Sequence, residues 1–521
     1  MTITVEQWDS FEHAFHSTDA GNPDQDIILE AQFTHQGRTF HVEGFYDGNA
    51  THKIRFMPDQ PGDWTFTTRS NLPALDGQAG RFQCAPAKPG NHGPVRVSNR
   101  IHFAYADGTP YIPVGTTCYV WNLQGDELEE QTLATLENAP FNKMRMCVFP
   151  KRYRFNHNEP PCYPYPGEVT IPWDPANLDN LRALPAAPFW DFERFNPLYF
   201  QHLEQRIRDL RDRGIEADLI LFHPYDFGAW GFDRLPPAAR ERLLRHLVAR
   251  LSAFRNLWWS FANEYDFVLD RSMEDWDHNM QLVQSLDPYN HLRSIHNCFT
   301  FYDHSKPWVS HCSIQNGRLD LVPVWLRQYA KPVVVDECGY EGDIPLLWGD
   351  LSPEELVARF WIGFASGGYV GHGETYLNDR EQLWWSKGGK LVGQSPARIA
   401  FLRQIIEQAP GGLLPLKQTD DSLPGPAPEL FDHPEAVRTL IPEGLWNMEA
   451  GGYHKTDYFL LYFGMHQPRL RNFNLPEGRF QIDVIDTWNM TIRRAADQAQ
   501  GKVSVDLPAQ KYMAIRIQKI A

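Results

Sequence analysis

Two glutamates stand at the ends of apolar segments, where a side chain can reach a ligand. Glu264 closes the segment Trp258–Glu264, and Glu337 closes the segment Val333–Glu337. A carboxylate in such a place borders an apolar wall yet faces a cleft, so its neighbours can tune its pKa. Hydrolysis of a glycosidic bond requires two carboxylates across one cleft, because one protonates the leaving oxygen while the other attacks the anomeric carbon or activates water.

Polar and aromatic residues at the ends of other predicted strands are candidates for substrate contact. Sugar hydroxyls suit His, Asn, Gln and carboxylate side chains as partners, and Trp or Tyr offers a flat apolar face. Tyr376 or Trp384 would form the floor of the sugar subsite. Arg145 would either position the nucleophile or form a buried salt bridge, whereas each histidine could be a satisfied structural residue. The candidates are Asn263, His223, His296, Gln315, Tyr376, Trp384, Trp121, Glu374 and Arg145.

The segment 100–410 must position these residues, and it alternates between strand and helix patterns. Eight short apolar runs are expected as strands, and most are followed by helical periodicity. Eight such units predict an α/β fold, a (β/α)8 TIM barrel with its active site at the carboxyl ends of the strands. Glu264 then ends strand four and Glu337 ends strand seven. The expected strands are 111–116, 143–149, 217–222, 257–262, 292–296, 309–314, 333–336 and 369–373.

Two observations bear on this topology. The gap 297–308 between the fifth and sixth strands is too short for a full helix. A doubly wound parallel sheet is the competing fold, but no glycine-rich phosphate turn follows the first strand. The barrel is therefore favoured. Asp336 precedes Glu337 and should point the opposite way along its strand, which suggests a structural role beside Arg145.

Short strands separated by turn residues fill both ends of the chain. Alternating patterns such as 39–46 predict a β-sandwich over 1–88, and a Pro- and Gly-containing linker follows it. The catalytic barrel is expected over 89–410. Glycine and proline breaks end the helical pattern there, so a second β-sandwich is expected over 411–521.

The segment 150–195, after the second barrel strand, is nearly free of helix and strand patterns. It carries nine prolines from Pro150 to Pro188, together with several tyrosines and tryptophans. Loops of this length are usually functional or disordered, and the aromatic content argues against disorder. We expect it to shape a substrate pocket, with a purely structural excursion as the alternative.

Composition excludes several classes of protein. The 521 residues include 49 Lys and Arg against 65 Asp and Glu, a net charge of −16, so nucleic-acid binding is not expected. No apolar run is long enough to span a membrane. Seven cysteines without a CxxC pattern indicate free thiols. The first residues lack the basic and apolar regions of a signal peptide, so a cytoplasmic protein is expected.

No metal or cofactor is expected. Four strand-end histidines could ligate a metal, but the first strand ends Thr116-Thr-Cys-Tyr119 without a His-x-His pair, and no HExxH occurs. A Ser-His-Asp hydrolase is not supported either, because the chain has no Gly-x-Ser-x-Gly elbow.

The chain resembles known glycosidases in several places. Asn263-Glu264 with Glu337 resembles the (β/α)8 glycoside hydrolases of clan A. The turn Pro61–Trp64 is similar to DUF5060 domains, the segment Asp107–Thr116 to the DUF4038 or apiosidase-like glycosidases, and the tail to DUF5605 domains. The resemblance implies that Glu264 is the acid/base, that Asn263 binds the sugar 2-hydroxyl, and that Glu337 is the nucleophile of a retaining reaction. It does not imply a particular sugar.

We therefore expect a retaining glycoside hydrolase, exo-acting on oligosaccharides or glycosides, with a carbohydrate substrate as its partner. Two alternatives stay open: a carbohydrate-binding protein on an inactive hydrolase scaffold, and a metal-dependent barrel hydrolase. The aromatic content would also suit a homo-oligomer formed through a sandwich domain.

Overall fold

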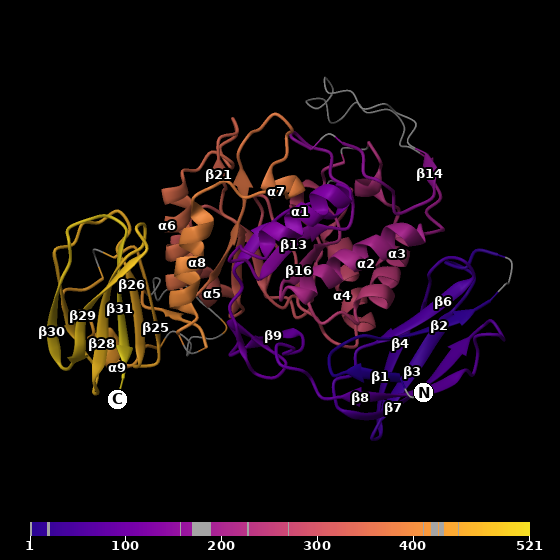
Figure 1. Ribbon diagram of the computed structural model, residues 1–521, viewed down its shortest axis with the longest axis horizontal. Helices are drawn as coiled ribbons and strands as arrows, with labels where there is room; N and C mark the ends of the chain where they lie inside the picture. Colours follow the sequence, from indigo (N-terminus) through magenta and orange to yellow (C-terminus); the bar gives the residue numbers. More distant parts are fainter. Residues whose placement is uncertain are drawn as a thin grey trace.

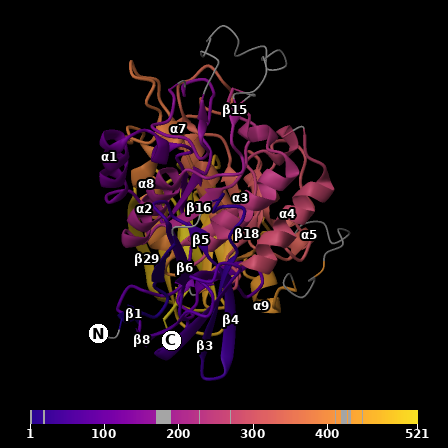
Figure 2. The ribbon, with the colours of Figure 1, turned by 90° about the vertical axis from the view of Figure 1, so that its right-hand side faces the viewer.

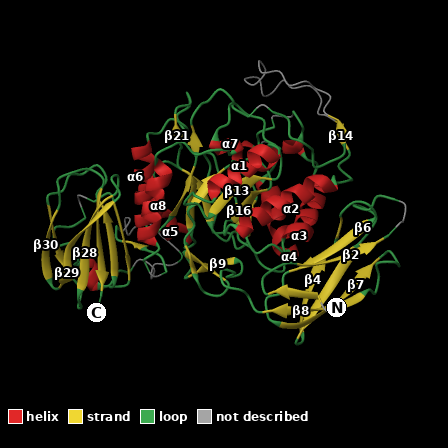
Figure 3. Cartoon of the chain, viewed as in Figure 1, coloured by secondary structure: helices red, strands yellow, loops and turns green. Residues whose placement is uncertain are grey.

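Three parts follow one another along the long axis of the molecule (Figure 1). A domain of strands comes first, a barrel lies in the middle, and a second domain of strands ends the chain, while nearly all helices gather in the middle part (Figure 3). The structure is a computed structural model. It describes residues 3–17, 21–156, 158–168, 189–226, 229–268, 270–409, 411–417, 426, 432–445 and 448–520.

Eight parallel strands form the central barrel, as the sequence predicts. They are hydrogen-bonded in the order β18-β17-β16-β13-β12-β22-β20-β19. A bridge between His296 and Ser313 joins the two end strands, so the barrel is nearly closed. The strands are β12 (Gly115–Thr117), β13 (Lys143–Cys147), β16 (Glu216–Ile220), β17 (Leu257–Ser260), β18 (Arg293–Ser294), β19 (Cys312–Gln315), β20 (Val333–Glu337) and β22 (Tyr369–His372).

Helices surround these strands, with α1 and α8 on one side and α4 and α5 on the other (Figure 2). The segment 297–308 between β18 and β19 contains no helix, as its length predicts. No helix in the described parts of the chain is both long enough and apolar enough to cross a bilayer. The helices of the barrel are α1 (Asp126–Leu136), α2 (Pro197–Asp212), α3 (Pro237–Leu251), α4 (Met273–Leu286), α5 (Val322–Tyr329), α6 (Pro353–Ala365), α7 (Trp384–Lys387) and α8 (Ser395–Ile406).

The first barrel strand differs from the expected 111–116. Tyr111 belongs to β11 (Pro110–Tyr111), which pairs with β10 (His102–Tyr105) in a small sheet that also contains β9 (Val95–Ser98). The barrel strand begins only at Gly115. Pro113 stands between the two strands, and a proline cannot donate to the ladder of a central strand.

The N-terminal domain consists of two sheets that pack face to face. Phe33 of one sheet stacks on Phe56 of the other at 4.3 Å, and Phe82 stacks on Phe11 at 4.1 Å. The first sheet has the order β1-β8-β7-β3-β4 and the second β2-β6-β5. The strands are β1 (Ile3–Glu6), β2 (Phe11–His16), β3 (Leu29–His35), β4 (Arg38–Glu43), β5 (Phe45–Tyr46), β6 (Thr51–Phe56), β7 (Gly62–Ser70) and β8 (Ala79–Ala85).

The C-terminal domain has a six-stranded sheet, β24-β25-β26-β31-β28-β29, and a two-stranded sheet, β27-β30. Phe473 of the small sheet joins Phe459, Phe480 and Ile515 of the large one in a single buried cluster. The elements are β24 (Leu414–Pro415), α9 (Glu435–Arg438), β25 (Ala450–His454), β26 (Tyr458–Tyr462), β27 (Leu470–Asn474), β28 (Phe480–Asp486), β29 (Thr491–Ala499), β30 (Lys502–Asp506) and β31 (Met513–Lys519).

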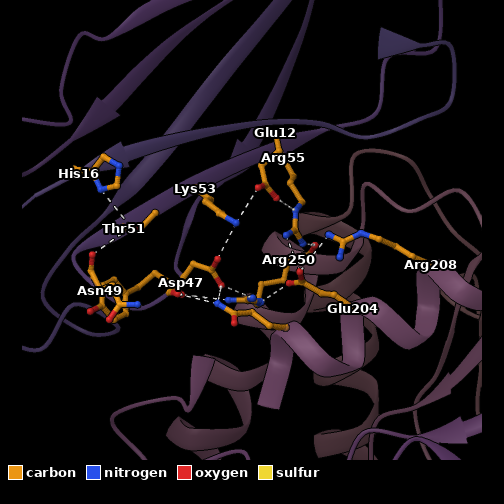
Figure 4. Close-up of polar contacts among 12 residues, drawn as sticks. Glu12, His16, Asp47, Asn49, Thr51, Lys53, Arg55, Glu204, Arg208 and Arg250 are labelled. Carbon is orange, nitrogen blue, oxygen red and sulfur yellow. Dashed lines mark hydrogen bonds and ion pairs between the residues drawn. The ribbon is translucent and has the colours of Figure 1, made fainter. Parts of the chain in front are cut away.

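A buried ion-pair network fixes the N-terminal domain to the barrel (Figure 4). Glu204 of α2 accepts from Arg250 of α3 at 2.6 Å and from Arg55 of β6 at 2.7 Å. Arg250 also pairs with Asp47, just after β5, at 2.6 Å. Because each charge has an opposite partner, the interface avoids the cost of an uncompensated buried ion.

Candidate active site

The two glutamates meet at the carboxyl ends of the barrel strands. Glu337 ends β20, and a β-bulge after Ile314 of β19 sets Gln315 directly opposite it. With its amide nitrogen facing the acids, Gln315 donates to Glu264 Oε1 at 3.0 Å and to Glu337 Oε2 at 3.2 Å. These two carboxylate oxygens are therefore no farther apart than the sum of the two distances.

Glu264 reaches this position through an unusual backbone conformation. It follows β17 and caps the short helix η4 (Tyr265–Phe267), with φ 48° and ψ 58° in the left-handed region. A residue with a side chain enters that region at an energetic cost that the surrounding structure must offset, and such residues cluster at functional sites. The turn aims the Glu264 carboxyl at Gln315.

A tyrosine hydroxyl donates to each glutamate. Tyr119, which follows β12, donates to Glu337 Oε1, and Tyr225, which follows β16, donates to Glu264 Oε2. The Tyr119 hydroxyl also lies 3.2 Å from Asn263 Oδ1. No sequence pattern singles out either tyrosine, although each lies three residues beyond a predicted strand, 111–116 or 217–222.

Asn263 is held by Arg145 rather than by the acids. Arg145 Nη2 donates to Asn263 Oδ1 at 3.0 Å, and its Nη1 lies 3.8 Å from Asp336 Oδ2. Lys143 completes this buried layer by pairing with Asp336 at 2.7 Å and Asp218 at 2.6 Å. Burial alone would raise the pKa of Asp336, but Lys143 and Arg145 outweigh it and hold that pKa below its usual range. Arg145 thus forms the buried salt bridge and also positions Asn263.

Burial and charge set the protonation of Glu264. Glu264 is 6% exposed, and burial, followed by the negative charge of Glu337, raises its pKa to about 7. The hydrogen bond from Tyr225 and the charge of Lys151 act in the opposite direction. Glu264 can therefore hold a proton near neutral pH, as a general acid must.

Lys151 lies in a cage of aromatic rings beside the pair. Its Nζ is 4.0 Å from the ring centre of Tyr119, 4.2 Å from that of Tyr225 and 4.1 Å from that of Trp385. Burial lowers its pKa to about 8, although the charges of Glu337 and Glu264 favour its charged form. Among the residues that the structure describes, no carboxylate lies within ion-pair distance of this ammonium group. No sequence signal singles out Lys151, because it follows Pro150 outside any periodic pattern.

The predicted histidines occupy two different environments. His223 has both ring nitrogens engaged: Nε2 lies 3.2 Å from the Phe149 carbonyl, and Nδ1 accepts from the Tyr225 amide at 3.1 Å. It therefore fixes the backbone of Tyr225. His296 lies closer to the acids, with Nε2 4.0 Å from Glu337 Oε1, and neither of its nitrogens has a hydrogen-bond partner among the described residues. A substrate contact for either histidine stays a prediction.

The predicted tryptophans are buried. Trp121 lies in η1 (Trp121–Leu123). Trp384 donates from Nε1 to Thr116 Oγ1 at 2.8 Å, and its neighbour Trp385 is the ring that faces Lys151 and Tyr119. The described contacts thus bring Trp385, rather than Trp384, to the pair.

Glu374 and Tyr376 belong to a second carboxylate group, which they form with Glu341. Glu374 of β23 (Glu374–Thr375) accepts from the amides of Val392 and Gly393 at 2.7 and 2.9 Å. Tyr376 donates to Glu341 of β21 (Glu341–Gly342) at 2.9 Å. Burial, with the charge of Glu341, raises the pKa of Glu374 to about 7. These contacts shape the loop before α8 and leave the substrate roles of both residues as predictions.

The described part of the 150–195 segment approaches the site through Tyr153, whose ring meets those of Tyr225 and Trp385 edge-on. A hairpin of β14 (Gly167–Glu168) and β15 (Phe189–Trp190) lies farther along. Residues 169–188, including Trp173, lie outside the described residues, so the expected pocket-shaping role stays a prediction.

One group with metal-ligand spacing exists among the described residues: Asp126, Glu129 and His202, on α1 and α2 outside the barrel. Arg206 already pairs with Glu129 there at 2.9 Å, so this group has its own cation. The fit to a metal ion is therefore poor, and the group is separate from the glutamate pair.

Family models match three stretches of the chain. The apiosidase-like catalytic domain matches residues 97–390, DUF5060 matches 4–71 and DUF5605 matches 446–518. The chain belongs to the apiosidase-like family. This apiosidase-like protein is thus a glycoside hydrolase, and its matched catalytic domain contains both glutamates. A search of curated proteins finds no match.

Solved structures agree with this assignment. A protein from Bacteroides vulgatus ATCC 8482, described as a candidate glycoside hydrolase, is 38% identical over 100% of both chains, with a TM-score of 0.86. A glycoside hydrolase family 5 structure from the same organism is 15% identical, covers 83% of this chain and 94% of its own, and has a TM-score of 0.57. At that identity the second likeness concerns the fold alone.

Proposed function

We propose that this apiosidase-like hydrolase cleaves glycosidic bonds with retention of anomeric configuration. Glu337 is the nucleophile and Glu264 the acid/base. The contact that carries the proposal is the Gln315 amide, whose nitrogen lies within hydrogen-bond distance of both carboxylates. One oxygen of each carboxylate is thus within a shorter distance of the other than the ~6.5 Å at which the carboxyl separation typical of inverting enzymes begins, and this closeness supports a direct attack by Glu337.

In the first step a Glu337 oxygen attacks the anomeric carbon as the bond to the leaving oxygen breaks. Glu264 gives its proton to that oxygen, and the leaving alcohol departs. In the second step Glu264 takes a proton from water, whose oxygen attacks the anomeric carbon and releases Glu337 as a carboxylate. Two inversions at one carbon give net retention.

The electrostatics of the pair suit both steps. Before the attack, the negative charge of Glu337 is one of the causes that raise the Glu264 pKa. Formation of the glycosyl ester removes that charge, so the Glu264 pKa falls just when a base is needed. Tyr225, which donates to Glu264, then stabilises the ionised form.

The surroundings of the nucleophile favour exo action. Tyr119 is 2% exposed and Trp385 3%, so the aromatic rings beside the nucleophile are shielded from solvent. Asn263, held by Arg145, is placed to bind a hydroxyl next to the anomeric carbon. A single sugar unit against these shielded rings, with the remainder of the substrate extending into solvent, is what an exo-acting glycosidase binds.

Azide rescue of two variants tests these roles. Aryl glycosides of hexopyranoses, pentopyranoses and furanoses are screened with the wild type, Glu337→Gly and Glu264→Ala, with and without azide. We expect Glu337→Gly to lose activity and to regain it as a glycosyl azide of inverted configuration. Glu264→Ala should give a glycosyl azide of retained configuration, because its nucleophile is intact. Activity of Glu337→Gly without azide would overturn the proposal.

A further inference from the structure

Two phenylalanines beside the acid/base are exposed, whereas most aromatic rings that the structure describes are buried. Phe299 is 80% exposed and Phe267 43% exposed, and their ring centres lie 5.5 Å apart. Among the aromatic residues that the structure describes, no others are exposed to this degree. Burying an aromatic ring is favourable, so a pair left in water indicates a surface that another molecule covers.

The backbone that carries both rings is held rigidly. The Asp266 carboxylate accepts from the amides of Cys298, Phe299 and Thr300 at 2.7, 2.8 and 2.8 Å. The Phe267 amide donates to the Glu264 carbonyl at 2.9 Å. A carboxylate that accepts three amides fixes a loop more firmly than neutral bonds would. The backbone that presents the two rings is therefore preorganised, and this lowers the entropy cost of binding.

Both rings are tied to residues of the catalytic pair. Phe267 lies in the turn that Glu264 caps. The loop of Phe299 continues from Asn297, which exchanges hydrogen bonds with the backbone of Gln315, the residue between the two acids. The proton donor must lie beside the glycosidic oxygen, so the leaving group extends from the anomeric carbon on the Glu264 side.

We propose that Phe267 and Phe299 form the platform on which the leaving-group sugar of the substrate rests. This inference depends on the proposed function and adds to it the kind of substrate: a glycoside whose leaving group is itself a sugar ring. The C–H face of a sugar ring covers the exposed face of Phe299, and Phe267 supports the edge of that ring. The glycone lies beside the buried aromatic rings around Tyr119, and this exposed pair takes the leaving group.

Two substrates with one glycone separate this platform from the catalytic steps. The glycosyl fluoride has a leaving group too small to touch the phenylalanines, whereas a disaccharide places a sugar on them. For Phe299→Ala we expect the ratio of kcat/KM for the disaccharide to kcat/KM for the fluoride to fall by about 3- to 10-fold, mainly through KM. Phe299→Tyr keeps the ring and should restore the ratio. Ile28→Ala, at an exposed apolar residue of the N-terminal domain, is the matched control.

The outcomes distinguish this inference from the proposed function. If the wild type hydrolyses the fluoride and the ratio measured for Phe299→Ala stays within twofold of the wild-type ratio, the platform alone is overturned. A wild type that hydrolyses neither substrate for any glycone would overturn the proposed function and the platform with it. A fall in the ratio that Phe299→Tyr does not restore would also contradict a role for the ring.

Discussion

The Tyr225 hydroxyl donates a hydrogen bond to Glu264 Oε2, and this bond favours the ionised form of Glu264, the proposed acid/base. Burial raises the Glu264 pKa, and the hydrogen bond from Tyr225 lowers it. A proton donor must also become a proton acceptor within one catalytic cycle. A pKa near neutral, between the extremes that burial and hydrogen bonding would each produce, serves both roles.

Removal of the Tyr225 hydroxyl should move the pH profile. In Tyr225→Phe the Glu264 carboxylate loses a donor, so its pKa rises and the alkaline limb of kcat/KM shifts upward by about 1 pH unit. The profile is measured with an aryl glycoside between pH 4 and 10. Tyr512→Phe, in the C-terminal domain, is the control. An unchanged or downward-shifted alkaline limb would show that this bond does not tune Glu264.

The raised pKa of Glu264 also predicts a cost in stability. The folded protein binds this proton more tightly than the unfolded chain, so stability is unaffected below about pH 4 and declines as pH rises toward 7. Glu264→Gln removes the decline. The difference in free energy of unfolding between variant and wild type should therefore grow by about 3 kcal/mol from pH 4 to pH 8.

Urea denaturation at the two pH values measures that difference. Glu127→Gln, at an exposed glutamate of α1, is the control. Its free energy of unfolding should differ from that of the wild type by the same amount at both pH values. If the Glu264→Gln difference were equally independent of pH, the carboxyl would have an ordinary pKa in the folded protein.

Lys151 should support catalysis through its charge. Lys151→Met keeps the apolar stem in the aromatic cage and removes the cation that opposes the charge of the pair. We expect kcat/KM at pH 7 to fall about 10-fold, which corresponds to ~1.4 kcal/mol. Lys88→Met, at an exposed lysine of the linker, should have no such effect. Equal activity of Lys151→Met and wild type would assign the lysine to packing alone.

The ion pairs between the N-terminal domain and the barrel should dominate the effect of mutations at that interface. Arg250→Met leaves Glu204 and Asp47 with one partner fewer in a buried site, and we expect a loss of about 3–5 kcal/mol in the free energy of unfolding. Arg208→Met removes a more exposed arginine from the same Glu204 and should cost below about 1 kcal/mol. Comparable losses in urea denaturation would mean that the buried pairs carry no special weight.

The meeting of Glu264 and Glu337 at one end of the barrel could be predicted because its signals are local. Apolar runs that end in Glu264 and Glu337 follow from strand burial, and a count of eight such runs places both at one end of a barrel. The shortness of the segment 297–308 correctly predicted that no helix connects the fifth and sixth barrel strands. Gln315 was among the candidates because it ends a strand, but its position between the two acids depends on a β-bulge that no residue pattern announces.

Other parts of the site depend on how loops fold over the barrel. Trp384 and Trp385 are adjacent in sequence, and only the packing of the short helix α7 decides that Trp385 faces the pair. Tyr119 and Lys151 lie just beyond the ends of strands, where side chains no longer alternate between two faces. Their directions therefore cannot be predicted from the sequence. Asp336 could be assigned a structural role in advance, because alternate residues of a strand point to opposite sides.

Trapping of the covalent intermediate tests the central claim most directly. The wild type is incubated with the 2-deoxy-2-fluoro aryl glycoside of the sugar found in the screen, and the intact mass and the modified peptide are then determined. The account predicts a mass increase of one fluorosugar, located on Glu337, that is absent in Glu337→Gln. Label on another residue, or turnover of the substrate without any covalent adduct while the product appears with inverted configuration, would contradict it.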